Sequence, residues 1–179
     1  MKLKVKSAQS IKNLALLETE NFALNVALIN SDKSLGQDRD IDVRFLVNVI
    51  EQAFESDLTE TVSYATLNKS ETYPDNTTLG EIADGTVKPT FNYHYDAFLN
   101  FCGTVIKVEK IPPMTIDEYT KEIQIGYFIT IATEEFTLIV EYSPVQCFDG
   151  FLGKQDGVYY VPSVGDIIKG KAEVTGFLI

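Results

Sequence analysis

The alternation of apolar and polar residues in the last third of the chain predicts β-strands. Apolar side chains recur at every second position in residues 123–131 and again in residues 136–142. Successive side chains of a strand point to opposite faces, so each segment has one apolar face that is expected to form the core. The short stretch between the two segments predicts an antiparallel hairpin. Further strands are expected at residues 102–111 and 166–179, and glycines interrupt the last one as they do where strands of small barrels bend.

The N-terminal half has patterns that predict helices. Leu46, Ile50 and Phe54 recur at a spacing of four residues, and Asp42 stands before them in the position of an N-cap. These features predict a helix over residues 43–54 that packs its apolar stripe against the rest of the protein.

Three other segments of this half carry weaker patterns. Residues 10–29 favour a helix at their start, although residues 22–29 fit a strand equally well. A short β-like run covers residues 62–67, and Thr78 with Glu81 has the spacing of a capping box for a short helix.

Together these patterns predict an α+β protein with two regions. A helix-containing N-terminal region (residues 1–95) is expected to precede a small five-stranded antiparallel β-barrel (residues 96–179) that is closed or nearly closed. The boundary is set near Asp96 because residues 89–101 are dense in aromatic side chains and lead into the strand series.

Composition narrows the range of partners. The net charge of -11 is shared evenly by the two regions, which disfavours nonspecific attraction to phosphate backbones. The longest uncharged stretches, residues 21–31 and 123–133, have eleven residues each, whereas a transmembrane helix needs about 20 apolar residues. The apolar run after the first lysines is cut off by Glu18, unlike the core of a signal peptide. We therefore expect a cytoplasmic protein that does not contact a membrane.

The residues that could carry chemistry are few and scattered. His94 is the single histidine of the sequence, and Cys102 and Cys147 have no close-spaced ligand beside them. In the reducing cytoplasm both cysteines are expected to be free thiols, with a disulfide bond between them as the alternative. The acidic run at residues 38–42 begins like a calcium loop, but Val43 occupies the position that requires glycine. We expect no metal, no cofactor and no catalytic residue, and hence a protein that is not an enzyme.

Two segments carry a resemblance to a known family. The first, FCGTVIKVE (residues 101–109), is a strand with an early glycine, and the second, VGDIIKGKAEVTG (residues 164–176), is a Gly-Asp turn followed by a glycine-containing strand. With the hairpin between them they resemble an OB-fold barrel of the tRNA-anticodon-binding-like kind. The resemblance covers about 80 residues, from about residue 98 to the end, and departs from the family where residues 143–164 lack the periodicity of a helix.

The resemblance implies a ligand surface over the second and third strands of the barrel. Phe128 and Thr130 would point outward from the second strand and Ile139 from the third, where Phe128 and Ile139 would form an apolar platform. Whether the N-terminal region covers this platform is left open by the sequence.

The same resemblance implies that the first strand pairs with the fourth, which would bring Lys107, Lys169 and Lys171 into one basic stripe. Glu109 and Glu173 alternate with these lysines, so a self-neutralised, solvated face is the alternative.

The function that follows as an expectation is a non-enzymatic binding module whose ligand is single-stranded nucleic acid or a protein or peptide. The alternative is an acidic interaction or inhibitor protein that acts on a DNA-binding partner, because spread negative charge permits such a role.

Overall fold

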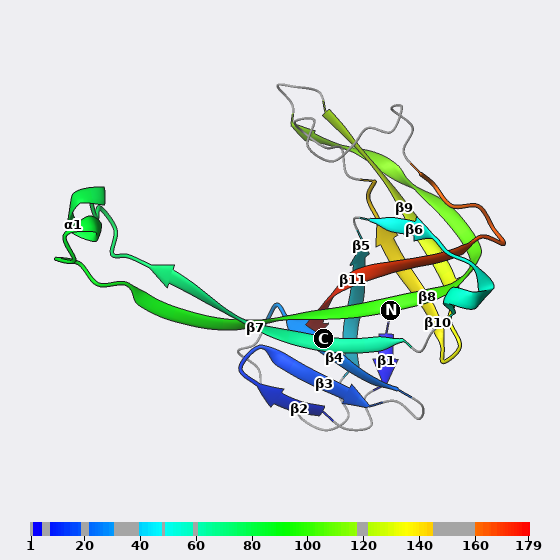
Figure 1. The fold of residues 1–179 in the computed structure, drawn as a ribbon, viewed down its shortest axis with the longest axis horizontal. Coiled ribbons are helices and arrows are strands. Elements are labelled where there is room, and N and C mark those ends of the chain that lie inside the picture. The colour runs from blue at the N-terminus through cyan, green and yellow to red at the C-terminus, as the bar shows by residue number, and fades with distance from the viewer. Residues whose placement is uncertain are drawn as a thin grey trace.

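A computed structural model describes residues 2–4, 8–18, 22–30, 40–47, 49–58, 61–117, 122–144 and 160–179. Within these residues the chain is built mainly of strands, and its eleven strands belong to one hydrogen-bonded sheet (Figure 1). The strands are β1 (Lys2–Lys4), β2 (Ala8–Ile11), β3 (Leu14–Glu18), β4 (Ala23–Leu28), β5 (Asp40–Val47), β6 (Ile50–Gln52), β7 (Val62–Thr72), β8 (Thr90–Asp117), β9 (Glu122–Ala132), β10 (Thr137–Tyr142) and β11 (Ile167–Leu178). A 3-10 turn, η1 (Glu55–Asp57), and a short helix, α1 (Leu79–Ala83), complete the described elements.

Five of the strands pair in a closed ring. The pairs run from β5 to β10, β9, β8 and β11, and β11 pairs back with β5. Phe45 of β5 lies opposite Val140 of β10 on one side and opposite Val174 of β11 on the other. The β5–β10 pair is parallel and the other four pairs are antiparallel. We call these five strands the ring.

The interior of the ring holds the main hydrophobic core. Ile41, Val43, Phe45 and Val47 alternate along β5 and are at most 1% exposed, because every second side chain of the strand points inward. The side chains that they meet come from all four other strands: Leu99, Ile129, Ile131, Leu138, Val140, Ile168 and Val174 are each completely buried. Burying one such side chain contributes about 1.5–3 kcal/mol, so this interior is the main source of stability.

Strands β4, β3 and β2 extend the sheet from the far end of β11. The connection is a short parallel pairing, in which Thr175 lies opposite Ala27 and Gly176 opposite Leu28. A Cβ atom at Gly176 would lie 2.4 Å from Cγ1 of Val26, so only glycine permits this close approach of β4 to β11.

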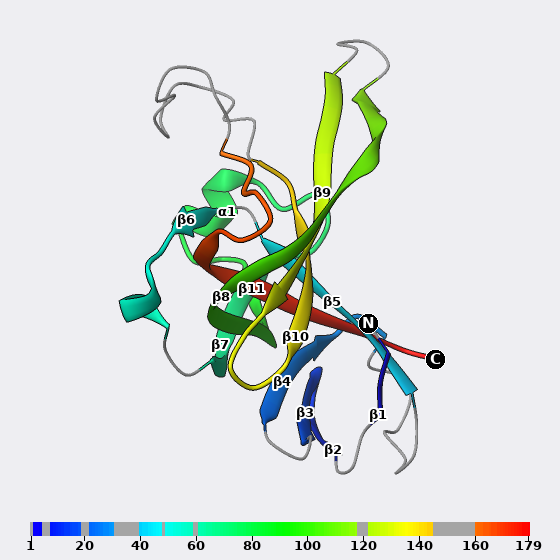
Figure 2. The same ribbon diagram turned by 90° about the vertical axis from the view of Figure 1, so that its right-hand side faces the viewer.

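Strands β7 and β8 form a two-stranded ribbon that projects from the rest of the molecule with α1 at its tip (Figure 1). The ladder runs from Val62 opposite Asn100 to Thr72 opposite Thr90. Its outer part, residues 66–96, is called the arm below. Further along the chain, β8 enters the ring and continues beside β9 (Figure 2).

The predicted helices of the N-terminal half are wrong, with one exception. Within residues 43–54 the described elements are the end of β5 and all of β6, and the proposed stripe is divided, since Ile50 is 6% exposed and Phe54 is 69% exposed. Asp42 lies within β5 and caps no helix, and the described elements within residues 10–29 are strands, from the end of β2 to β4. The exception is α1, where Thr78 and Glu81 form the expected capping box.

The fold class is therefore corrected from α+β to a mainly β protein. A five-stranded antiparallel barrel made of residues 96–179 alone is also wrong, because the fifth strand of the ring is β5 from the N-terminal half and its pairing with β10 is parallel. The expected boundary near Asp96 falls inside β8. The hairpin was correctly predicted: β9 and β10 pair antiparallel from Thr137 opposite Ala132 to Tyr142 opposite Tyr127. In the described part of the chain, no helix has the length and apolar character needed to cross a bilayer.

Candidate binding surfaces

Phe128 and Ile139 lie on the outer surface of the ring. Phe128 of β9 is 38% exposed and Ile139 of β10 is 45% exposed. The register places Phe128 opposite Glu141, and Ile139 opposite the half-buried Thr130. Phe128 and Ile139 are therefore diagonal neighbours on one face, about 7–8 Å apart, which is within reach of an aromatic ring. The N-terminal half leaves both side chains accessible.

A hollow of about 460 Å³ opens beside Phe128. It lies between β5, the far part of β8, β9 and β10, and its lining is largely apolar. The lining residues are Arg44, Leu46, Val47, Ile111, Pro112, Gly126, Phe128, Glu141, Tyr142 and Ser143. This volume is within the range of about 300–1,000 Å³ that is typical of small-ligand sites. The hollow can accept one large side chain or a small organic group.

The two charged groups at this hollow neutralise each other. Nε and Nη2 of Arg44 donate hydrogen bonds to the two carboxylate oxygens of Glu141, at 2.7 and 2.6 Å. These hydrogen bonds, and then the negative charge of Glu141, raise the pKa of Arg44. Because two of the guanidinium N–H groups already donate to Glu141, Arg44 is poorly placed to hold a phosphate as well.

Tyr142 provides a polar group on the inner side of the hollow. Its side chain is buried, and its hydroxyl donates a hydrogen bond of 2.8 Å to the backbone oxygen of Tyr160. Burial, and then the charge of nearby Tyr127, raise the pKa of Tyr142. The hydroxyl therefore stays protonated at neutral pH and fixes the segment at Tyr160 against the ring.

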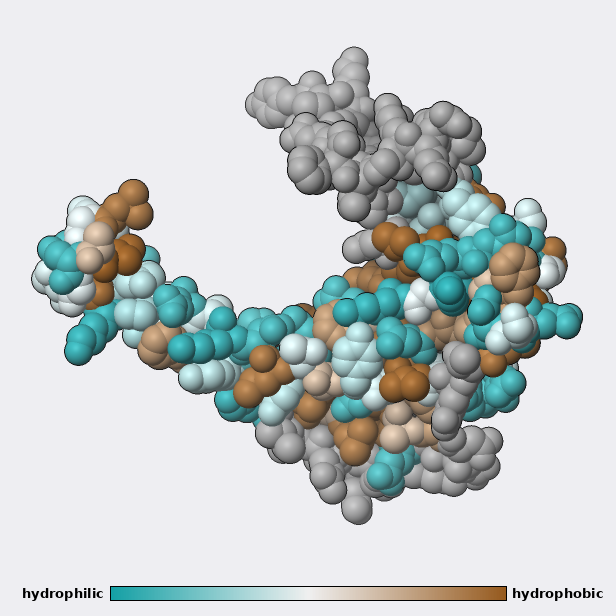
Figure 3. Space-filling view, in the orientation of Figure 1, coloured by the Kyte–Doolittle hydropathy of each residue, from teal (hydrophilic) through white to brown (hydrophobic). Residues whose placement is uncertain are grey.

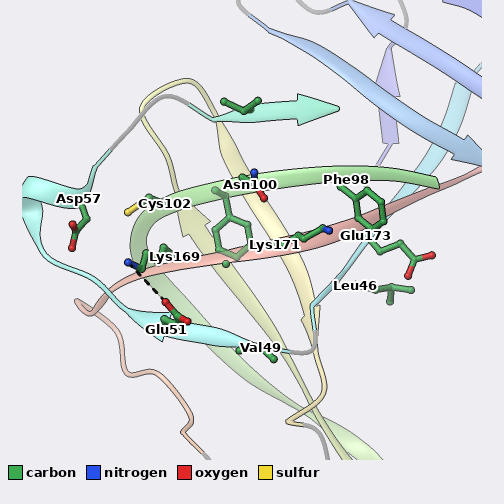
Figure 4. Close-up of a pocket in the computed structure, with 13 residues that line it drawn as sticks. Leu46, Val49, Glu51, Asp57, Phe98, Asn100, Cys102, Lys169, Lys171 and Glu173 are labelled. Atoms are coloured by element: carbon green, nitrogen blue, oxygen red, sulfur yellow. Dashed lines mark ion pairs between the residues drawn. The ribbon is translucent and has the colours of Figure 1, made fainter. Parts of the chain in front are cut away.

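A second concave surface, of about 730 Å³, follows β8 and β11 (Figure 4). Side chains of β8 form one row and side chains of β11 the other, with Lys169 opposite Cys102 and Lys171 opposite Asn100. Figure 4 shows Glu51 on the neighbouring strand β6, reaching toward Lys169. The lining residues are Leu46, Val49, Glu51, Asp57, Val62, Phe98, Asn100, Phe101, Cys102, Lys169, Gly170, Lys171 and Glu173. We call this surface the β8–β11 groove.

Both lysines of the β8–β11 groove have partners. Nζ of Lys169 is 3.8 Å from a carboxylate oxygen of Glu51. Nζ of Lys171 lies 3.8 Å from the ring centroid of Phe98 and 5.6 Å from that of Tyr64, which is cation–π geometry.

Lys107 does not join these two lysines. The β8–β11 ladder ends where Thr104 lies opposite Ile167, and Lys107 lies beyond that point, opposite Thr130 of β9. Its Nζ forms an ion pair of 2.8 Å with Glu109. The expected pairing of the first and fourth strands of the series is present, but the three lysines form no common stripe.

The residues considered for chemistry remain apart from one another. Among the described residues, no group of three or more His, Cys, Asp and Glu side chains is arranged to hold a metal ion. His94 lies on the arm, with Nε2 3.8 Å from Asp96, while Cys102 is 3% exposed beside the ring. Cys147 lies outside the described residues.

Sequence reasoning missed the arm as a surface. Phe91, Tyr93 and Tyr95 occupy alternate positions of β8 and so share one face of the ribbon, together with Leu67 of β7. The signal was present in the sequence, because an aromatic residue at every second position is typical of a strand with one apolar face. From the sequence, the aromatic residues within 89–101 indicated only a boundary between two regions.

Comparison of the chain with protein-family models, with curated proteins and with solved structures finds no match.

Proposed function

We propose that the chain is a non-enzymatic binding module that holds a protein or peptide segment against the ring at Phe128. The observation that carries this proposal is an accessible Phe128, with Ile139 beside it, at the rim of a hollow with apolar walls. Exposed apolar patches rimmed by polar residues are typical of protein-binding surfaces. An apolar side chain of the bound segment would enter the hollow, and Phe128 would pack over it as the central contact.

The charges near this face favour a protein segment over nucleic acid. Lys107 is paired with Glu109, and Arg44 is paired with Glu141. The whole chain has a net charge of -11. Binding of nucleic acid depends on cations that can replace the counterions of phosphates, and paired cations serve this purpose poorly.

Single-stranded nucleic acid remains the second candidate ligand because of one cluster in the β8–β11 groove. Lys171, Phe98 and Tyr64 combine a cation with two aromatic rings, which is the combination that binds single strands by stacking and charge.

A relation to OB-fold barrels is part of this proposal. It is supported by the five strands of the ring, three of which, β8, β9 and β10, follow one another as neighbours in the ring. In such barrels the second and third strands carry the ligand; if the strands are counted from β8, these would be β9 and β10, which carry Phe128 and Ile139. A cytoplasmic location is also proposed, since a buried thiol such as Cys102 is usual in a reducing compartment.

The test is a peptide-display selection on the full wild-type chain, followed by affinity measurements of the enriched peptides on the wild type and on F128A. We expect enriched peptides to bind the wild type at least about tenfold more tightly than F128A, because Phe128 would be the central contact. The matched control is N92S, an exposed substitution on the polar face of the arm, which should bind like the wild type. Peptides that bind the wild type and F128A equally would contradict the proposal.

The second candidate is tested by titrating a labelled single-stranded oligonucleotide at low salt. We expect no saturable binding at high micromolar protein. Saturable binding that K171A or F98A weakens would instead favour nucleic acid in the β8–β11 groove.

A further inference from the structure

The two faces of the arm differ in chemistry. On one face the cross-strand pairs are Leu67 with Tyr95, Lys69 with Tyr93, and Glu71 with Phe91. On the other face they are Asn68 with His94, Ser70 with Asn92, and Thr72 with Thr90. The first face, which we call the aromatic face, is rich in large rings, whereas the second carries only polar side chains.

The aromatic face continues the core-facing side of β8 into solvent. Ala97 and Leu99, on the same side of the strand, are completely buried, and Tyr95 is half-buried. At Tyr95 the side chain of Asn13 makes the hydrogen bonds that a neighbouring strand would make. The amide nitrogen of Asn13 donates to the backbone oxygen of Tyr95, and the amide oxygen of Asn13 accepts from the backbone N–H of Tyr95, both at 2.8 Å. Beyond this clamp Tyr93 is 47% exposed and Phe91 43% exposed. The apolar side of the strand thus extends past the end of its cover.

The arm gains little stability from its own contacts. Residues 90–97 of β8 pair only with β7 among the described strands, and α1 has no buried residue. Leu79, the first residue of α1, is 85% exposed, and hydrophobic side chains are visible at the far end of the arm in Figure 3. An isolated two-stranded ribbon and a helix of five residues are each marginally stable in water. A partner that covers the aromatic face would remove exposed apolar area and stabilise the arm.

We propose that this partner is a second copy of the chain, and that two arms pack aromatic face to aromatic face about a twofold axis. The charges on the aromatic face are the reason for choosing a second copy as the partner. Lys69 and Glu71 follow each other on one strand of the face, so a twofold contact can place Lys69 of each copy beside Glu71 of the other. Lys69 and Glu71 together carry no net charge, and Nζ of Lys12, 4.8 Å from the ring centroid of Tyr93, adds a positive charge at the inner end of the face. Two chains of -11 repel each other in general. A basic partner would gain nothing, because the face has no net negative charge to attract it.

The centre of the contact is formed by Phe91 and Tyr93. Nζ of Lys69 lies 3.6 Å from the ring centroid of Phe91, so the charge of this lysine is held over that ring by a cation–π contact. Stable interfaces involve about 20–30 residues on each partner, and the aromatic face is formed by three cross-strand pairs. The dimer is therefore expected to be reversible, with a dissociation constant in the micromolar range.

Sedimentation equilibrium of the full chain tests this assignment with a charge exchange. The wild type should show a monomer–dimer equilibrium. K69E places two glutamates on each face and E71K places two lysines there, so each variant alone should dimerise at least about tenfold more weakly. An equimolar mixture of K69E and E71K should recover the association, because each acidic face then meets a basic one.

Two further variants test whether dimerisation depends on the aromatic face or on the arm in general. The double variant F91S/Y93S should abolish the dimer. Its circular dichroism spectrum should still show the strand signal of a folded ring. N92S, on the opposite face between these two positions, should dimerise like the wild type. A wild type that stays monomeric at several hundred micromolar would overturn the proposal, as would a K69E and E71K mixture that stays monomeric. A dimer that survives F91S/Y93S would also overturn it. None of these outcomes depends on ligand binding at Phe128.

Discussion

The ring and the arm share strand β8 and differ in what covers it. Where β8 enters the ring, residues 98–100 lie between β7 and β11, and Leu99 is completely buried. In the arm, the same strand pairs only with β7, and Tyr93 on the same side is 47% exposed. An apolar alternation thus defines one face of a strand, but the surrounding topology decides whether that face becomes a core or a contact surface for another molecule.

The largest expected difference in the free energy of unfolding is between a core residue of the ring and an exposed residue of the arm. Phe45 is 1% exposed between β10 and β11, so F45A should lower the free energy of unfolding by about 3–5 kcal/mol. F91A should change it by less than about 0.5 kcal/mol in dilute solution, because Phe91 lies outside the core. Urea unfolding at submicromolar protein measures both changes. A change below about 1 kcal/mol for F45A would mean that β5 is not part of the ring.

A second contrast uses two glycines. A Cβ atom at Gly103 would lie 2.4 Å from the backbone oxygen of Ala132, whereas at Gly80 the nearest atom is 3.9 Å away. G103A should therefore cost about 1–3 kcal/mol, because the β8 and β9 backbones must separate. G80A, in the exposed helix of the arm, should leave the melting temperature of the ring unchanged. Differential scanning calorimetry compares the two, and equal melting temperatures would contradict the close β8–β9 contact.

A smaller effect concerns a carboxylate that ties the start of β7 to the β9–β10 turn. Glu135 accepts hydrogen bonds from the backbone N–H and hydroxyl of Thr61, at 3.0 and 2.6 Å. Burial raises the pKa of Glu135, but the hydrogen bonds from Thr61 outweigh it and hold the pKa below its usual 4.5. The stabilisation that these hydrogen bonds give the folded protein is therefore complete above the ordinary pKa of a glutamate. It is lost as the pH falls through the lower pKa that Glu135 has in the folded state.

E135Q should accordingly cost about 1 kcal/mol at pH 7, and the difference from the wild type should shrink below pH 4.5. The control is E81Q on the arm. Glu81 also has a lowered pKa, caused by hydrogen bonds with Thr78, but it lies in α1 at the tip of the arm, away from the ring (Figure 1). E81Q should leave unfolding of the ring unchanged at every pH. Urea unfolding across this pH range tests both variants, and a difference for E135Q that grows in acid would contradict the assignment.

The strands of the C-terminal part could be predicted because their alternation is unambiguous. Leu138, Val140 and Tyr142 all point inward as the pattern indicated. The short α1 was also predictable, since the capping box of Thr78 and Glu81 is a local signal that needs no tertiary context.

The N-terminal half was misinterpreted because one segment fits two periods. Leu46, Ile50 and Phe54 match a helical spacing, but Ile41, Val43, Phe45 and Val47 alternate with a period of two and are the residues that become buried. Short apolar runs cannot be assigned by periodicity alone, and β-branched residues at alternate positions were the stronger signal. That β5 closes the ring depends on pairing with strands about a hundred residues away, which no local pattern specifies.

The candidate site was only partly predictable. Outward positions such as Phe128 and Ile139 follow from strand alternation, but their exposure does not, because the alternation cannot say whether the N-terminal half covers them; both are exposed. The separation of Lys107 from Lys169 follows from where the β8–β11 ladder ends, which the sequence does not specify.

The difference between ring and arm is tested most directly by hydrogen exchange at two protein concentrations. Amides of β8 within the ring, such as that of Leu99, should be strongly protected at both concentrations, because they open only on global unfolding. Amides of the arm that donate to β7, such as those of Asn92 and His94, should exchange rapidly in dilute monomer and become protected as the concentration rises through the dimerisation range. Arm amides that are as protected as the ring at every concentration would contradict the account.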